Sequence, residues 1–211
     1  MKRATKHWKP SGLLLICCIV VAAFAGATAH GAAKSSVVSF NMVRSQGAAN
    51  GNCLAGAAAS VRVQSIGPVE VMTVVVRGLP ANTDFDFFVI QVPNGPFGMS
   101  WYQGDIVTNA GGVGVGVFIG RFNIETFIVA PGSQPAPFVH NNAFPDATSN
   151  PATGPIHTFH LGLWFNDPAD AVKAGCPGTV TPFNGEHNAG IQVLSTRNFA
   201  NDQGPLRQLT P

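Results

Sequence analysis

Short runs of apolar and β-branched residues, separated by turn residues, recur along most of the chain. The segment 60–66 alternates valine with arginine or glutamine, the period-two pattern of a strand with one buried face. The segment 69–77 is almost continuously apolar, as in a strand buried on both faces. The pattern predicts nine short strands, at 37–43, 60–66, 69–77, 85–92, 101–108, 113–119, 122–129, 157–165 and 190–196.

Glycine, proline and asparagine mark the turns between these strands. The segment 108–113 predicts a hairpin, with Asn and Gly at positions of positive φ. Gly114 and Gly116 then alternate with valine, so one face of the next strand has no side chains. Such a bare face allows close packing within the fold, or close approach by the backbone of a neighbouring segment or partner.

One short helix is expected at 168–174. Asp167 can cap its first turn, Pro168 suits the first helical position, and Asp170 lies three residues after the cap. Gly175 suits the left-handed residue that ends a helix. Capping therefore accounts for both aspartates without a catalytic role.

Composition agrees with an all-β fold and excludes several classes of protein. The 211 residues include 24 Gly and 16 Pro, which a long helix or coiled coil would not tolerate. Only 10% of residues are charged and 45% are hydrophobic, unlike a disordered tail or a strongly basic nucleic-acid binder. Frequent short strands and turns predict a sandwich or a barrel, and of these we expect an antiparallel β-sandwich.

The first 29 residues resemble a secretory signal peptide. Four basic residues lie within the first nine positions, an apolar run covers 13–26, and Ala27-Thr28-Ala29 is a small-residue cleavage site. We expect cleavage after Ala29, with Gly31 or Ala33 as alternatives. An uncleaved membrane anchor is the other interpretation, although a spanning helix needs about 20 apolar residues.

Removal of the leader changes the charge of the chain. The leader holds four of the twelve basic residues and none of the ten acidic ones, so 30–211 has eight basic against ten acidic residues. We expect one secreted domain at 30–211, with no nucleic-acid partner and no membrane span after signal removal.

Two cysteines, Cys53 and Cys176, lie beyond the predicted leader. A pair of cysteines in a secreted chain predicts one disulfide, whose long loop would stabilise the fold by about 4–5 kcal/mol. Two free thiols, or half of a metal site, are the alternatives. The Pro-rich segment 131–155 predicts a long loop, either functional or a disordered connector.

A family resemblance covers residues 69–119. The turn entering a predicted strand carries Leu79, Thr83 and Phe85, which resembles a late strand of fibronectin type III and related immunoglobulin-like domains. The segment 104–112 resembles a strand and turn of bacterial secreted β-sandwich domains. The resemblance implies an immunoglobulin-like sandwich, whose roles are mostly adhesive or structural.

Aromatic and polar residues provide a candidate ligand-binding surface. On a regular strand, Trp101 shares a face with Gln103 and Asp105, and Trp164 shares one with His160. Aromatic faces beside hydrogen-bonding groups suit a sugar or a protein partner, although tryptophans also fill sandwich cores. The predicted ligand-binding residues are Trp101, Tyr102, His160 and Trp164.

Motifs for catalysis are not found in the sequence. There is no nucleophile elbow, zinc-protease motif or phosphate-binding loop. His157 and His160 would lie on opposite faces of one strand, although His187 could join one of them. Asp84 and Asp86 alternate with core phenylalanines, so we expect both aspartates to face solvent. We therefore expect no catalytic residues, metal or cofactor.

These observations predict an extracellular, non-catalytic module with a structural, adhesive or binding role. The expected partner is an extracellular protein or a glycan. Carbohydrate binding is the first specific alternative, and a secreted hydrolase with its site near the Pro-rich loop is the second. Two carboxyl groups, or two histidines, brought together by the fold would favour the hydrolase.

Overall fold

The chain folds into short antiparallel strands with three short helices in its described part. The computed structural model describes residues 37–122, 126–128 and 155–209, so the predicted signal peptide, its cleavage site and nearly all of the Pro-rich segment lie outside them. The strands are β1 (Val37–Arg44), β2 (Ala58–Ile66), β3 (Val69–Arg77), β4 (Asp84–Ile90), β5 (Ser100–Val107), β6 (Gly114–Gly120), β7 (Thr126–Ile128), β8 (Pro155–His157), β9 (His160–Phe165) and β10 (Gln192–Ser195). The helices are α1 (Gln46–Asn50), α2 (Pro168–Lys173) and the 3₁₀ helix η1 (Pro205–Gln208).

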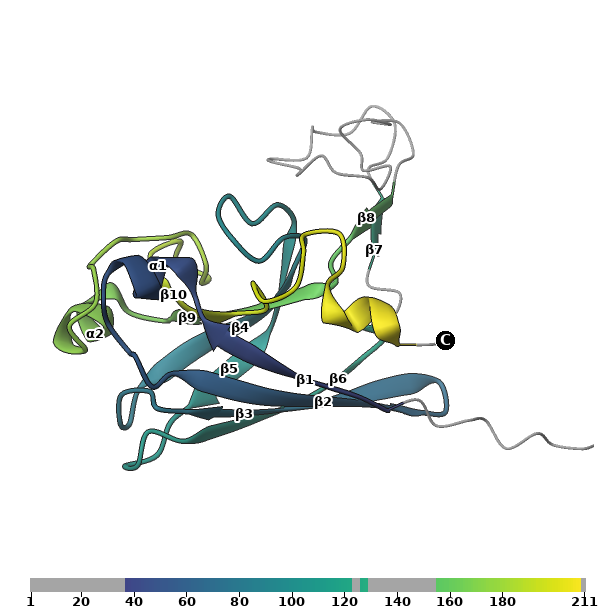
Figure 1. The fold of residues 1–211 in the computed structure, drawn as a ribbon, viewed down its shortest axis with the longest axis horizontal. Coiled ribbons are helices and arrows are strands. Elements are labelled where there is room, and N and C mark those ends of the chain that lie inside the picture. Colours follow the sequence, from purple (N-terminus) through teal and green to yellow (C-terminus); the bar gives the residue numbers. More distant parts are fainter. Residues whose placement is uncertain (1–36, 123–125, 129–154, 210–211) are drawn as a thin grey trace, which may run out of the picture. The chain divides into compact units, whose positions relative to one another are not determined.

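Eight of the strands form one antiparallel sheet in the order β5-β4-β9-β10-β1-β2-β3-β6, and β7 pairs with β8 separately (Figure 1). The two edge strands, β5 and β6, are consecutive in the chain and are joined by a tight turn in which Thr108 bridges Gly114. The sheet therefore curves until its edges approach each other, nearly closing into a barrel. The all-β, antiparallel prediction is confirmed.

The predicted hairpin at 108–113 is a turn between sheet edges rather than a paired ribbon. Its tip is closed by Asn109 N–H donating to the Val113 carbonyl, at 2.8 Å, and Gly112 has a φ of +70°. A Cβ on Gly112 would lie 2.1 Å from the carbonyl oxygen of Leu79, so only glycine lets this tip pack on the 78–80 turn. Beyond the single bridge, each strand pairs with a different neighbour.

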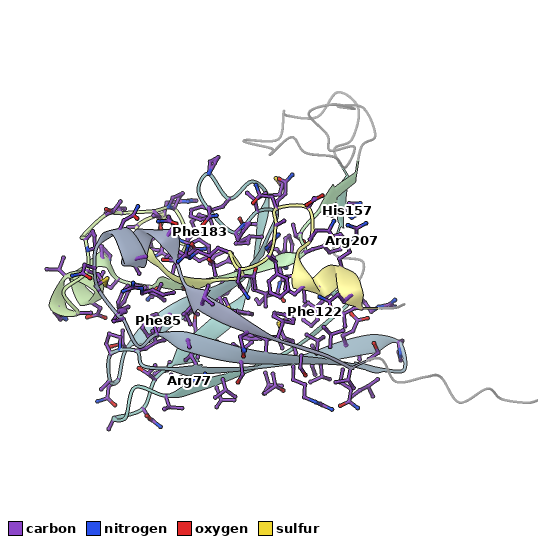
Figure 2. The ribbon with its side chains drawn as sticks, viewed as in Figure 1. Arg77, Phe85, Phe122, His157, Phe183 and Arg207 are labelled. Atoms are coloured by element: carbon purple, nitrogen blue, oxygen red, sulfur yellow. A yellow bond between two sulfur atoms is a disulfide. The ribbon has the colours of Figure 1, made fainter. Side chains whose placement is uncertain are left out.

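The main core lies inside the curved sheet, and a smaller cluster lies outside it. Along β4, Phe85 and Phe87 point into the main core, whereas Phe88 points to the outer cluster with Trp164 of β9. Figure 2 shows Phe85 and Phe183 on opposite sides of these two strands. Consequently β4 and β9 are buried on both faces.

Two predicted strands are shorter than expected. The predicted strand 157–165 is interrupted, because the Phe159 carbonyl accepts from Leu206 N–H at the start of η1 instead of pairing within a sheet. The predicted strand 122–129 contains only β7 among the described residues. The helices α1 and η1 were not expected, because one turn of helix is too short to show a periodic pattern.

The predicted helix and disulfide are both confirmed. Asp167 accepts a hydrogen bond from Ala169 N–H at 2.7 Å as the cap of α2, and Gly175 has a φ of +74°. Cys53 and Cys176 form a disulfide across a sequence separation of 123 residues. It joins the loop after α1 to the loop after α2. None of the helices in the described ranges has the length and apolar character that a membrane-spanning helix needs.

Candidate functional site

The four residues predicted to bind a ligand do not lie on one surface. Trp101 and Tyr102 on β5 are about half exposed, whereas His160 and Trp164 on β9 are fully buried. A fully buried side chain does not meet a ligand at the surface, so the prediction is corrected for His160 and Trp164. The reason is that loops cover the outer face of β9, with Phe183 over Trp164 and Asn201 beside His160. The alternation of residues along a strand does not reveal such a cover.

His160 has a structural position. Its Nδ1 lies 2.9 Å from Thr196 Oγ1, and its Nε2 lies 3.1 Å from the backbone oxygen of Asn201. Burial lowers the pKa of His160 to about 4, and its hydrogen bonds to the backbone oppose this shift only in part. The neutral ring therefore links β9 to the C-terminal loop.

Trp164 fills the outer cluster. The ring of Phe183 stacks on it with centroids 4.0 Å apart, and Phe88 and Phe97 meet it edge-on at 5.5 and 5.0 Å. Trp164 therefore has the other role that the sequence allowed for the tryptophans, which is to fill a core. The loop that carries Phe183 is held against the sheet by this stack.

A β-bulge in β5 decides which side chains share its outer face. Two consecutive residues of β4 pair with Gly104 and Tyr102, which leaves Gln103 as an extra residue. Gly104 has a φ of +148°, which favours glycine. The bulge inverts the alternation, so Asp105 lies with Tyr102. The prediction that Asp105 shares a face with Trp101 and Gln103 is wrong for this reason.

Two carboxyl groups meet on this outer face. Asp86 of β4 lies directly opposite Asp105 of β5, and the Tyr102 hydroxyl donates to Asp105 Oδ1 at 2.5 Å. The expectation that Asp86 faces solvent is wrong, because Asp86 is only 3% exposed. It lies beside Trp164 of the neighbouring strand β9. Asp84, next along the same face, is half-buried.

Their surroundings change the protonation of these groups. Burial, with the nearby negative charges of Asp105 and then Asp84, raises the pKa of Asp86 to about 7. Burial and the Asp105 charge also raise the pKa of Asp84 above its usual range. Burial and the bond to Asp105 raise the pKa of the Tyr102 hydroxyl, which keeps it a donor. Near neutral pH, Asp86 is therefore protonated in a large fraction of the molecules.

A groove of about 420 Å³ lies over this carboxyl pair. One wall is formed by β4 and β5, and the other by the ends of two loops. A second hollow of about 320 Å³ shares Asn166, Asn184 and Gly185 with the groove and continues it toward Asp167 and Glu186. The groove is lined by Asp86, Phe88, Tyr102, Asp105, Asn166, Pro182, Asn184 and Gly185.

Asparagine side chains hold the loop that forms the second wall. Asn184 Nδ2 donates to the Asn166 carbonyl at 3.0 Å and to Asn188 Oδ1 at 2.7 Å, while Asn188 N–H donates to Asn184 Oδ1 at 2.8 Å. The loop therefore places amide groups at the groove without help from a helix or strand. The sequence analysis did not identify Asn166 and Asn184 as residues of a site. The only local sign of them was the Asn184-Gly185 pair, which indicated a turn.

Among the described residues, no group of three or more His, Cys, Asp or Glu side chains could hold a metal ion. Asp86 and Asp105 lie directly opposite each other on adjacent strands, and Asp86 is buried whereas Asp105 is exposed. Asp86 Oδ2 is buried and has no hydrogen-bond partner in the described part of the chain.

No protein-family model matches the chain, and neither a curated protein nor a solved structure matches it. The groove is therefore interpreted from its own geometry and chemistry.

Proposed function

We propose that this protein is an extracellular, non-catalytic binding module that holds a sugar in the groove over β4 and β5. The observation that carries the proposal is the convergence of an aromatic ring, two carboxyl groups and two side-chain amides on one groove of about 420 Å³. Small-molecule sites have volumes of about 300–1,000 Å³, and a few polar groups orient the ligand in them.

The polar groups of the groove match the hydroxyl groups of a sugar. Asp105 offers carboxyl oxygens that accept hydrogen bonds, and the Asn166 amide can both donate and accept. Both N–H groups of the Asn184 amide are donated within the loop, so Asn184 offers its Oδ1 as an acceptor. Tyr102, about half exposed, presents part of an aromatic face, and its ring is steadied by Phe88 with centroids 5.5 Å apart. An aromatic face beside hydrogen-bonding groups suits a sugar ring.

The hydrolase alternative receives less support from the same groove. Two carboxyl groups do converge, which was the feature that would favour an enzyme. Asp86, however, is only 3% exposed, so one of the two carboxyl groups is largely closed to a substrate or an attacking water, whereas a glycosidase uses both. A binding role needs only Asp105, which is exposed.

Two broader assignments belong to the same proposal. The leader-like segment 1–29 and the Cys53–Cys176 disulfide support an extracellular location. The Leu79, Thr83 and Phe85 pattern supports an immunoglobulin-like relative, and we keep that finer fold assignment as a proposal. Binding a glycan or another surface molecule is a role that such secreted domains can serve.

A glycan array, followed by calorimetry with the best oligosaccharide, tests the proposal. We expect binding that weakens by about tenfold or more in Asp105→Asn and in Tyr102→Ala, because each removes a group facing the groove. Trp101→Ala is the matched control, since Trp101 is an exposed aromatic on the opposite face of the same strand. Absence of binding to every sugar, or an equal loss in the control, would refute sugar recognition.

A further inference from the structure

The outward face of β3 and β6 is largely aliphatic, and no other element that the structure describes covers it. Val115, Val117 and Ile119 on β6 are 59%, 60% and 70% exposed, and the half-buried Val71 and Val75 lie opposite two of them on β3. Ile66, at the end of β2, extends the patch at 51% exposure. We name this set the β3–β6 stripe, and it consists of Ile66, Val71, Val75, Val115, Val117 and Ile119.

The outward positions of β6 are apolar, unlike those of an ordinary half-buried strand. Such a strand places its apolar side chains inward and polar ones outward. In β6, Gly114 and Gly116 point inward, where a Cβ would come within 2.9 Å of Ile106, while the β-branched residues point outward. Packing accounts for the inward glycines, but it gives no reason for the outward valines. Figure 1 shows neither α1, α2 nor η1 across β2 and β3 on this side.

We propose that the β3–β6 stripe is the contact surface of a homodimer, in which a second copy packs its own stripe against the first. A two-fold axis near Val117 would set Val115 of one copy against Ile119 of the other. Flat faces of β-branched residues pack well on a second sheet, because their side chains interdigitate. A self-complementary patch of this kind needs no other partner.

Charged side chains lie at the rim of the stripe and not within it. Arg77 lies at one end on β3, and Arg62 of β2 lies beside Thr73, and both arginines are exposed. Glu70, which pairs with Arg121, is 2% exposed on the core side of β3, so it does not reach the stripe. The two-fold arrangement therefore buries aliphatic side chains and leaves the arginines at its rim, where solvent and salt screen their charge.

The size of the stripe predicts the strength of the dimer. Six aliphatic side chains at these exposures offer on the order of 500 Å² per copy, within the range of functional surface patches. Burying that area on both copies gives on the order of 1,000 Å², the lower limit for a specific interface. The dimer should therefore be weak and depend on protein concentration.

Sedimentation velocity of the purified protein over a wide concentration range tests the dimer. We expect the average mass to rise from one copy toward two, and Val117→Glu and Ile119→Glu to remain monomeric at every concentration. Both substitutions lie at exposed positions, so we expect the far-ultraviolet circular dichroism of the wild type to be retained. Ser39→Glu is the matched control, since it adds the same charge to an exposed position of β1 on the same sheet face.

A cross-link tests the position of the axis. Val117→Cys should give a symmetric disulfide-linked dimer under mild oxidation, and Ser39→Cys should not. A wild-type protein that stays monomeric throughout, or a dimer that persists in both glutamate variants, overturns the proposal. Monomeric protein that sediments with phosphatidylcholine–phosphatidylglycerol vesicles, and loses this in Val117→Glu, also overturns it by assigning the stripe to a lipid surface.

Discussion

The carboxyl group of Asp86 lies at a buried position, where water solvates its ionised form poorly. It sits between Asp105 on one neighbouring strand and Trp164 on the other, and the cover over the outer face leaves it 3% exposed. Burial and the adjacent negative charges keep it protonated up to a pH of about 7. A buried, protonated carboxyl can donate a hydrogen bond, which an ionised aspartate cannot.

This protonation predicts a pH-dependent stability. Between a pH of about 4 and about 7 the folded protein retains a proton that the unfolded chain releases, so Asp86 lowers the free energy of unfolding as pH rises through that window. We expect Asp86→Asn to have little effect near pH 4 and to stabilise the protein near pH 8, measured by urea denaturation. The contribution of His160 is common to both proteins and cancels in the difference.

Glu186→Gln is the control for that experiment, because Glu186 is an exposed carboxylate on the adjoining hollow. It gives the baseline for neutralising an exposed carboxyl group beside the groove. A difference between Asp86→Asn and wild type that is the same at both pH values would show that Asp86 is ionised in the folded protein.

At the scale of the element, β6 shows how one strand serves two surfaces. Its inward glycines leave space that Phe118 and Ile106 occupy, and Phe118 stacks on Phe87 of the main core with centroids 4.9 Å apart. The interpretation of Gly114 and Gly116 as close-packing positions is therefore confirmed. The outward residues of the same strand form the middle of the β3–β6 stripe.

Gly116→Ala should destabilise the protein by about 1–3 kcal/mol, because the new Cβ would lie 2.6 Å from Phe118 Cζ and overpack the core. The matched control is Gly56→Ala, where a Cβ meets no atom within 4 Å. Both substitutions reduce the flexibility of the unfolded chain similarly. Equal free energies of unfolding for the two variants would contradict the packing argument.

At the scale of the whole molecule, one disulfide ties the two halves of the sequence together. Cys53 follows α1, and Cys176 follows α2 just before the loop that forms the second wall of the groove. Both cysteines are buried in the main core cluster. The disulfide thus anchors one end of the loop whose other contacts are Phe183 on Trp164 and the asparagine network.

Cys53→Ala with Cys176→Ala should lower the free energy of unfolding by about 4–5 kcal/mol, since the bond closes a loop of more than a hundred residues. Urea denaturation of the double variant against the wild type measures the loss. The proposed sugar binding should weaken in the same variant, because the groove loop loses an anchor. A loss below about 1 kcal/mol would show that the unfolded chain gains little freedom without the bond.

Local patterns predicted the elements of this fold well. The segment 69–77 coincides with β3, and Asp167 and Gly175 mark the ends of α2 as their capping chemistry requires. These features depend on residues close together in the chain, so the sequence alone contains their cause. The pairing of Cys53 with Cys176 was also accessible, because only one pairing remains once the predicted leader is removed.

The groove was decided by tertiary structure. Asp86 was expected in solvent because alternation distinguishes two faces of a strand but does not say that a distant loop covers the outer one. Tyr102 joined Asp105 because a bulge at Gln103 inverted the alternation, and Asn184 reached the groove from almost a hundred residues away along the chain. By itself, the sequence determined which residues form strands, turns and a helix cap. Burial and convergence needed the folded chain, because they arise from contacts between segments far apart in sequence.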